Sequence, residues 1–438
     1  MPKTKYGRTI MTMIAAAVII GATAIHYSLS IPPKRPEAIF QYVETLMVKN
    51  NGSQPIEFGG ISTETFLDFT WQKPRIVYVN HNYQISKDRD GNPLILIEGP
   101  PQLAPNDTYT ITIVCEIESF QREIPEVSIM ESGNLSDIPY SLVNYTREVA
   151  PWRSPPTMRL DTAIWNNTQY YNMTLQEIAT ELKGDSQNVL EMVLSDIRWI
   201  SDSIRYDSAA PTYPIETAMN RKGDCDDQSN LLIALLRLQG IPSFLMLGQV
   251  YLPMEEYENF TDTAMDGHLF YETHYTMGHA WAMVYIPPWG WLPCDPVVAN
   301  PDYPLKYAIT EAFVKYPITL VFKNITGVNE AEAADYIGSS REETRMAEEE
   351  ELYFWLIQDM RQTTLSLYVI ILRSPIFILY AEAVCSAAAI LIVGIYDKRR
   401  TRLLEAYQIN ICLYCRAENL PDAVYCGHCG QRIKRSRD

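Results

Sequence analysis

Three short segments constrain this chain most, because together they supply a thiol, an imidazole and a carboxylate. Cys225, His279 and Asp295 occur in that order, each beside residues that suit a catalytic role. Such a set can provide a nucleophile, a general base and a group that orients the base. We therefore predict a catalytic site built from the segments Gly223-Asp224-Cys225-Asp226-Asp227, Gly278-His279-Ala280-Trp281 and Trp291-Leu292-Pro293-Cys294-Asp295-Pro296.

Cys225 is expected at the amino end of a buried helix. The apolar run after it is closed by Gly240 and Pro242, which are stop signals. Unpaired N–H groups at a helix start favour a thiolate, and they can hold the oxyanion that forms when a thiolate attacks a carbonyl. The charges of Asp226 and Asp227 oppose thiolate formation, and the sequence leaves open which effect is larger.

His279 and Asp295 are expected on the two strands of one hairpin. Residues 279–286 alternate as in a strand, residues 287–290 form a turn signal, and residues 291–295 return. The even spacing lets an antiparallel pairing place both side chains on one face, opposite each other. Asp295 would then orient the imidazole that takes the proton from the thiol.

These motifs resemble those of the transglutaminase-like superfamily, papain-related cysteine enzymes with G-D-C, H-A-W and W-x-x-x-D-P segments. The resemblance covers residues 175–296 and implies an α+β, papain-like core that transfers acyl groups through a thiol. Cys225 or His279 alone would more often be structural, and a fold retained without activity is the second interpretation. His268 and His274 lie nearby in a polar, aromatic loop and are interpreted as surface residues rather than bases.

The regions around this core have weaker signals. Short β-rich runs at 76–79, 94–97 and 109–117 predict a small β-sandwich before the core. Helices are predicted at 175–183 and 189–204, with Trp165, Trp199 and Tyr206 as core residues. The predicted organisation is an anchor at 1–33, a β-sandwich-like domain at 34–125, a connector at 126–170, the transglutaminase-like domain at 171–328, an acidic, solvated helical stalk at 329–373, a transmembrane helix at 374–396, and a basic segment with a zinc ribbon at 397–438.

Two apolar segments predict membrane helices. Residues 9–33 carry no formal charge and follow three basic residues, although Ala22-Thr23-Ala24 also resembles a signal-peptidase site. Residues 374–396 reach about 34 Å as a helix, enough to cross a bilayer, and Glu382 is their only charge. Basic residues follow directly, so both termini are expected in the cytoplasm and the middle region outside it.

Glycosylation signals and charge agree with this topology. The acidic residues outnumber the basic ones by 53 to 36, which argues against a nucleic-acid partner for the outer region. All the N-x-S/T triplets lie between the two apolar segments. They begin at Asn51, Asn106, Asn134, Asn144, Asn166, Asn172, Asn259 and Asn324.

The C-terminal tail carries a four-cysteine pattern. Cys412, Cys415, Cys426 and Cys429 form two C-x-x-C pairs separated by ten residues, which is typical of a closed, structural zinc site. Disulfides are the alternative, but a cytosolic tail lies in a reducing compartment and so favours Zn²⁺. This zinc ribbon would bind an unknown cytosolic partner or an acidic surface. Of the outer cysteines, Cys115 and Cys294 are able to form a disulfide, which leaves Cys225 free.

Together these features predict a cysteine enzyme of the plasma membrane with an extracytoplasmic catalytic domain. Its substrate would be an amide in a peptide, a protein or the cell wall, attacked without a catalytic cofactor. Hydrolysis is favoured over transfer to an amine because no acidic EF-hand loop accompanies the core. The alternative is a non-catalytic envelope receptor or scaffold whose ribbon recruits a partner.

Overall fold

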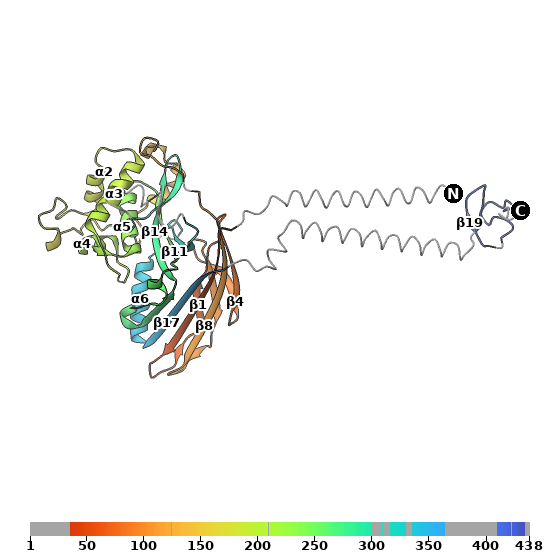
Figure 1. Ribbon diagram of the computed structural model, residues 1–438, viewed down its shortest axis with the longest axis horizontal. Coiled ribbons are helices and arrows are strands. Elements are labelled where there is room, and N and C mark those ends of the chain that lie inside the picture. The colour runs from red at the N-terminus through yellow and green to blue at the C-terminus, as the bar shows by residue number, and fades with distance from the viewer. Residues whose placement is uncertain are drawn as a thin grey trace. The chain divides into compact units, whose positions relative to one another are not determined.

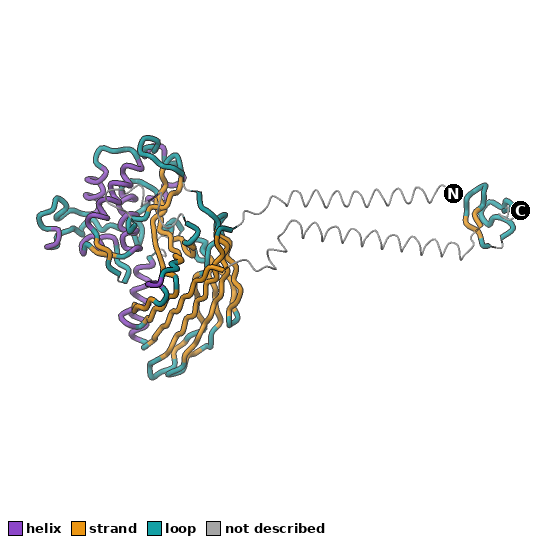
Figure 2. Tube along the Cα trace, in the orientation of Figure 1, coloured by secondary structure: helices purple, strands orange, loops and turns teal. Residues whose placement is uncertain are grey.

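The computed structural model describes residues 36–123, 125–208, 210–298, 309, 316–329, 335–363, 410–421 and 423–433 (Figure 1, Figure 2). The chain divides into two compact units, Arg35–Thr364 and a second that joins Met1–Lys34 to Leu365–Asp438. The two predicted membrane helices, within 1–33 and at 374–396, lie outside the described residues. Among the described helices, none has the length and apolar character needed to cross a bilayer.

The larger unit contains an antiparallel sheet covered by helices. The strand order is β15-β14-β11-β16, and α5 packs on β14 and β11 while α2, α3 and α4 pack on α5. Figure 1 shows these helices gathered on one side of β14 and β11. The bounds are α2 Leu175–Lys183, α3 Val189–Ser203, α4 Pro214–Asn220, α5 Cys225–Leu238, β11 Ser243–Tyr251, β14 Thr276–Ile286, β15 Gly290–Cys294 and β16 Thr319–Ile325. The predicted α+β core, its helices and its hairpin are confirmed.

Helix α5 is the central element of this core. Every residue from Asp227 to Arg237 is buried, so the helix has no solvent face and is apolar through most of its length. Gly240 follows it with φ of +85°, the left-handed conformation that ends many helices and that glycine adopts without a Cβ clash. The sequence signals for the start and the end of this helix are both confirmed.

A second, six-stranded sheet forms the other side of the unit. Its order is β12-β13-β17-β1-β8-β4, antiparallel throughout except for the parallel pair of β13 and β17. The bounds are β1 Ala38–Asn50, β4 Gln72–Val79, β8 Thr108–Ser119, β12 Phe260–Ala264, β13 Leu269–His274 and β17 Leu352–Thr363. The shorter strands of this unit lie outside the two larger sheets: β2 Ile56–Glu57, β3 Gly60–Glu64, β5 Tyr83–Lys87, β6 Pro93–Glu98, β7 Gln102–Leu103, β9 Arg205–Tyr206 and β10 Lys222–Gly223. Short 3₁₀ helices lie at Leu135–Asp137, Tyr140–Thr146, Ala163–Trp165, Glu255–Tyr257 and Met265–Gly267.

This sheet corrects the predicted boundaries on either side of the core. The strands expected within 34–125 are present, and Ile95 and Ile97 of the small sheet β3-β6-β5 pack against the inner face of β8. They do not close a separate sandwich, because β1 pairs along its whole length with β17. The expected helical stalk at 329–373 is confirmed as a helix in α6 (Tyr336–Glu349), but it is wrong over Leu352–Thr363, which forms β17 within the sheet. Long strands such as β1 and β8 expose a full row of N–H and C=O groups, which a distant segment pairs here.

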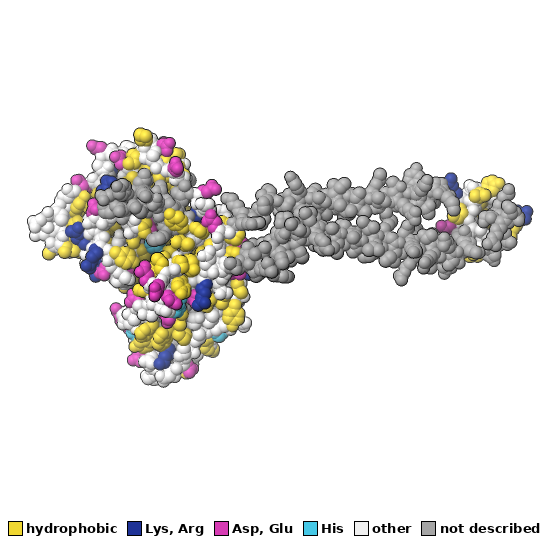
Figure 3. All heavy atoms as spheres, in the orientation of Figure 1, with side chains coloured by type: hydrophobic (Ala, Val, Ile, Leu, Met, Phe, Trp, Pro, Cys, Tyr) yellow, Lys and Arg dark blue, Asp and Glu magenta, His cyan; other side chains and the backbone are white. Residues whose placement is uncertain are grey.

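The surface agrees with the acidic composition. Figure 3 shows Asp and Glu side chains spread over the visible described face of the larger unit, with fewer Lys and Arg.

Residues 126–170 form turns and short helices as expected for a connector, but they also place Trp152, Leu160 and Trp165 in the main hydrophobic core. In the smaller unit, the described residues form a compact ribbon with a hairpin of β18 (Asn410–Ile411) and β19 (Glu418–Asn419).

A buried carboxyl joins three helices of the core. Asp196 of α3 is fully buried and accepts hydrogen bonds at 2.9 and 3.0 Å from the amide of Gln239, which also donates to Ala179 of α2 at 3.1 Å. Burial raises the pKa of Asp196 well above its ordinary value, although the Gln239 hydrogen bond opposes the shift. The folded protein therefore binds the Asp196 proton more tightly than the unfolded chain does, and this group destabilises the fold as the pH rises above about 4.

We expect Asp196→Asn to stabilise the protein at pH 8 by roughly 1–3 kcal/mol. The Asn side chain stays neutral at this pH, so no charge is buried, and its amide can also donate to Oε1 of Gln239, which has no partner among the described residues. The gain should shrink toward pH 4, and thermal unfolding of the full chain across this range measures it. Asp202→Asn, at an exposed position of the same helix, is the matched control and should change stability by less than about 0.5 kcal/mol. A destabilised Asp196→Asn protein at pH 8 would contradict the expectation.

Candidate active site

Cys225 is the first residue of α5, as predicted. Asp224 precedes it in an extended conformation, and the Cys225 N–H lies in the first turn, where a helix has no internal acceptor for it. A larger residue than glycine would clash at position 223, because a Cβ atom there would lie 2.6 Å from the Cβ of Asp227 and 3.0 Å from Cγ2 of Thr217. The glycine of the first motif thus lets the start of α5 pack against α4.

His279 and Asp295 meet across the hairpin. The Nε2 atom of His279 lies 2.7 Å from Oδ2 of Asp295, which is fully buried, while the imidazole is 12% exposed. Oδ1 of Asp295 accepts a hydrogen bond from the Val297 N–H at 3.2 Å. Both carboxylate oxygens are therefore engaged, and the Nδ1 atom of the imidazole is the ring nitrogen left to take a proton.

The register differs in detail from the prediction. Ala282 pairs with Cys294, so continuing the ladder places Asp295 across from Trp281 rather than from His279. The pair is diagonal, which the reach of an imidazole allows. Trp281 also packs against the His279 ring, with the ring centroids 5.9 Å apart and the planes at 26°.

The backbone of β14 connects His279 to the nucleophile. The Ala280 N–H is close enough to Cys225 for a hydrogen bond to its sulfur, and the Ser229 hydroxyl of α5 donates to the Ala280 carbonyl at 3.3 Å. Since Ala280 directly follows His279, these contacts hold the helix start against the strand that carries the base. Cys225 thus lies at the strand that carries His279, near the charge of Asp295, and the catalytic role of the three residues stays a prediction.

The charges around Cys225 answer the question that the sequence leaves open. Burial, followed by the carboxylates of Asp226 and Asp224, raises the pKa of Cys225 well above its ordinary value, although the Ala280 N–H lowers it. Burial lowers the pKa of His279, but the charge and hydrogen bond of Asp295 outweigh it and the pKa is raised. These shifts favour a neutral thiol at Cys225 and a more basic imidazole at His279.

Tyr206 is a site residue that the sequence interpretation missed. It was expected in the core with Trp165 and Trp199, which are indeed buried, but Tyr206 is 55% exposed. It pairs with Gly223, two residues before the nucleophile. Burial and the nearby charges of Cys225 and Asp224 raise the pKa of its phenol. Its polar neighbours in sequence, Arg205 and Asp207, were the available signal for an exposed position.

Other candidates lie outside the site. His274 contacts Glu272 at 3.1 Å, and His268 stacks on Tyr353, so neither is placed as the base. The disulfide between Cys115 and Cys294 is wrong: both cysteines are free and buried, in two different hydrophobic clusters. Burial, together with the charge of Asp295 in the second case, raises the pKa of each thiol.

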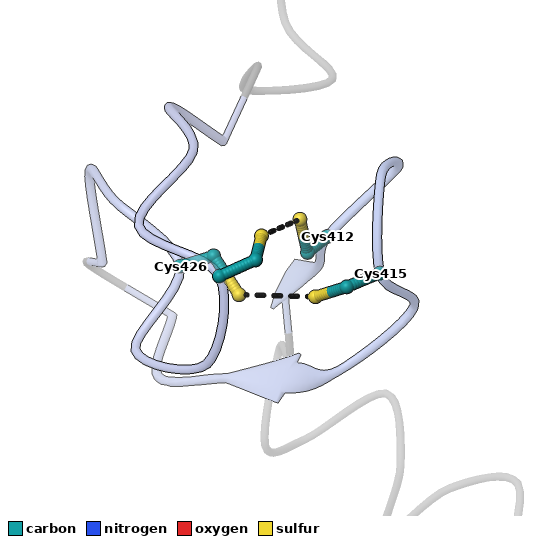
Figure 4. A group of neighbouring side chains, drawn as sticks. Cys412, Cys415 and Cys426 are labelled. Atoms are coloured by element: carbon teal, nitrogen blue, oxygen red, sulfur yellow. Dashed lines mark hydrogen bonds between the residues drawn. The ribbon is translucent and has the colours of Figure 1, made fainter.

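The four tail cysteines form a second cluster. Their Sγ atoms lie within 4.8 Å of one another, with 3.6 Å between Cys412 and Cys429 and 3.4 Å between Cys415 and Cys426. Figure 4 shows Cys412, Cys415 and Cys426 directed toward a common centre. Backbone N–H groups, first that of Cys429, lower the pKa of Cys426 to about 6. A tetrahedral Zn²⁺ with four thiolates places its sulfurs about 3.8 Å apart, so the donor set and its spacing fit this ion.

The comparison with known families decides the identity of the main site. Residues 176–296 match the sequence profile of the transglutaminase-like superfamily, a range that contains Cys225, His279 and Asp295. This segment resembles a transglutaminase-like core. A search of curated proteins finds no match.

Several solved structures resemble the chain at low identity. A candidate cysteine protease from Cytophaga hutchinsonii is 14% identical, over 75% of this chain and 92% of that one, with a TM-score of 0.44. The periplasmic domain of TgpA from Pseudomonas aeruginosa is 14% identical, over 60% and 72%, with a TM-score of 0.25. A candidate protease from Parabacteroides distasonis is 12% identical, over 59% and 63%, with a TM-score of 0.17.

If His279 is the base for Cys225, its removal should slow alkylation of the Cys225 thiol. In His279→Ala the thiol keeps its raised pKa but loses the proton acceptor, so its alkylation by iodoacetamide below pH 8 should fall at least about tenfold. Reaction should persist only at high pH, where the thiolate forms without help. Peptide-level mass spectrometry of the full chain reads Cys225 separately from the other cysteines. His274→Ala is the control, and equal rates in the two variants would contradict the assignment.

Proposed function

We propose that this protein is a cysteine enzyme that cleaves amide bonds through a thioester intermediate. The single observation that carries the proposal is the Nε2–Oδ2 pair of His279 and Asp295, held beside Cys225 by the Ala280 backbone. The Asp295 carboxylate holds the proton on Nε2 of His279, so Nδ1 stays basic. The orientation of the ring then sets the direction in which Nδ1 can accept a proton. Few structural roles need a histidine and a buried carboxylate placed in this way beside a thiol.

The proposed reaction runs in two halves. The Cys225 sulfur attacks the amide carbon while its proton passes to His279, and the carbonyl oxygen becomes an oxyanion beside the Cys225 N–H. Collapse breaks the C–N bond, the amine leaves with the proton from His279, and the acyl group remains as a thioester. Water, deprotonated by His279, then attacks the thioester, which releases a carboxylic acid and restores the thiol. An amine in place of water would give a new amide.

Hydrolysis is the outcome we favour, with a peptide, protein or cell-wall amide as substrate. The chain is proposed to sit in the plasma membrane with its catalytic unit outside and both termini inside, on the evidence of the two apolar segments, their basic flanks and the sequons. The exposed phenol of Tyr206 beside the nucleophile is the described side chain best placed to contact the substrate.

One observation favours a second candidate function. The raised pKa of Cys225, caused by burial and by two carboxylates, is unfavourable for a nucleophile and would be harmless in a protein that only binds. The alternative is therefore an envelope receptor or scaffold with an enzyme-like fold.

An activated ester separates these functions without knowledge of the substrate. We expect p-nitrophenyl acetate to release p-nitrophenol in a burst close to one per chain, followed by slower turnover as the acyl-enzyme hydrolyses. Added glycinamide should raise turnover and yield N-acetylglycinamide only if an amine can replace water. Cys225→Ala should abolish the burst, whereas Cys115→Ala, at a buried thiol of the other cluster, should retain it. An unchanged signal in Cys225→Ala would favour the receptor.

We also propose that Cys412, Cys415, Cys426 and Cys429 hold one structural Zn²⁺. Four thiolates would close its coordination shell, so the ion would brace the ribbon and take no part in amide cleavage. A ribbon of this size has a small hydrophobic cluster, and a metal would supply much of its folding free energy. The partner of the ribbon would be a cytosolic protein or an acidic surface.

Metal analysis of the purified full chain should find about one zinc per chain. Cys426→Ser should lower this content strongly because it removes one of four ligands, while Cys115→Ser should leave it unchanged. The proposal would be contradicted if the ribbon cysteines of a zinc-free preparation resisted alkylation and became reactive after reduction, because this behaviour indicates disulfides. Alkylation of Cys225 should be the same with and without the metal.

A further inference from the structure

Helix α6 lies outside the matched family segment, yet it reaches the first turn of α5. The Tyr336 hydroxyl donates to Oδ2 of Asp226 at 2.6 Å and accepts from Nδ2 of Asn230 at 2.5 Å. Asp226 is the residue after the nucleophile. A side chain more than 100 positions away in sequence thus contacts the immediate neighbour of Cys225.

The direction of these hydrogen bonds is fixed by a third residue. Oδ1 of Asn230 accepts from the indole N–H of Trp152 at 2.8 Å, and both residues are fully buried. The amide nitrogen of Asn230 must therefore be the group that faces Tyr336. Because a hydroxyl has one proton, the Tyr336 O–H is committed to donating to Asp226.

Asp226 needs such an anchor because its surroundings are acidic. Oxygen atoms of Asp224 and Asp226 and the sulfur of Cys225 lie within 4.8 Å of one another, and both carboxylates disfavour the thiolate. The titratable groups that face Cys225 or Asp226 are Asp224, Asp227, Asp295, Tyr206, Tyr271 and Tyr336, and His279 is bound to Asp295. The Tyr336 O–H stabilises the negative charge on Oδ2 of Asp226 through a charge-assisted hydrogen bond, which weakens the effect of that charge on the sulfur.

We propose that Tyr336 is a positioning residue for the nucleophile, which acts by fixing the carboxylate of Asp226. The catalytic site then includes α6, and the core of residues 176–296 is incomplete without it. This inference rests on the proposed function, since it assigns Tyr336 a role in the reactivity of Cys225.

The docking of α6 does not depend on the Tyr336 hydroxyl, which makes the role testable. Tyr213 donates to Asp335 at 2.9 Å, and Arg341 contacts Glu216 at 2.6 Å. Ile337 is also fully buried. These contacts hold the helix start, so Tyr336→Phe should remove one hydrogen bond and leave α6 in place.

The experiment is the pH profile of Cys225 alkylation by iodoacetamide in the full chain. We expect Tyr336→Phe to slow the reaction roughly tenfold below pH 9 and to move its midpoint upward by about one pH unit. Tyr213→Phe removes another hydroxyl that contacts α6 but not Asp226. It is the matched control and should stay within about twofold of the unmodified chain.

A double-mutant cycle separates positioning from packing. Asp226→Asn removes the charge that Tyr336 is proposed to hold, so Tyr336→Phe should have no further effect in that background. An unchanged profile for Tyr336→Phe, an equal effect of Tyr213→Phe, or a tenfold effect that persists with Asn at 226 would each overturn the inference. If Tyr336→Phe fails to fold, Asp226→Asn alone should still lower the midpoint of the Cys225 alkylation profile. A midpoint that rises in Asp226→Asn would overturn the inference.

Failure of the proposed function would look different. In that case Cys225 of the unmodified chain would titrate without any response to His279→Ala. The effect of Tyr336→Phe on the midpoint would remain measurable against that behaviour.

Discussion

The packing of α5 against β14 is the interaction on which the rest of this structure depends. The helix is buried from Asp227 to Arg237, so its apolar side chains fix its position between the sheet and three other helices. That position sets Cys225 beside Ala280 and therefore beside His279. A site made from a helix start and a strand is more precise than one made from loops, because the core that stabilises the fold also holds the reacting groups.

The site is an electrostatic compromise. Burial and the carboxylates of Asp226 and Asp224 raise the pKa of Cys225, and this effect is larger than the lowering by the Ala280 N–H. The buried pair of His279 and Asp295 offsets this by providing a stronger base at the same place. In the proposed reaction, the Cys225 proton therefore has to move to His279 during attack on the substrate.

The six-stranded sheet changes how the chain is divided. Strand β17 follows α6 and pairs with β1 over twelve residue pairs, so the segments before and after residues 176–296 form one sheet, which also includes β12 and β13. Helix α6 extends this closure to the nucleophile through Tyr336. Residues at both ends of the larger unit are therefore part of the same folded body as Cys225, His279 and Asp295.

The sequence by itself determined the placement of Cys225 at a helix start and of His279 on a hairpin, the helices predicted at 175–183 and 189–204, and the four-cysteine cluster. These are local patterns: periodicity, turn residues and motif spacing act within about 20 residues, and the apolar run that starts at Leu231 and stops before Gly240 defines the helix that begins at Cys225. Only the tertiary structure decided the diagonal register of Asp295, the exposure of Tyr206, the fate of residues 335–363 as a helix and a central strand, and the contact of Tyr336 with Asp226. Pairing between distant strands is chosen by competition among many partners of similar propensity, and the charge on a buried thiol depends on groups that only folding brings together.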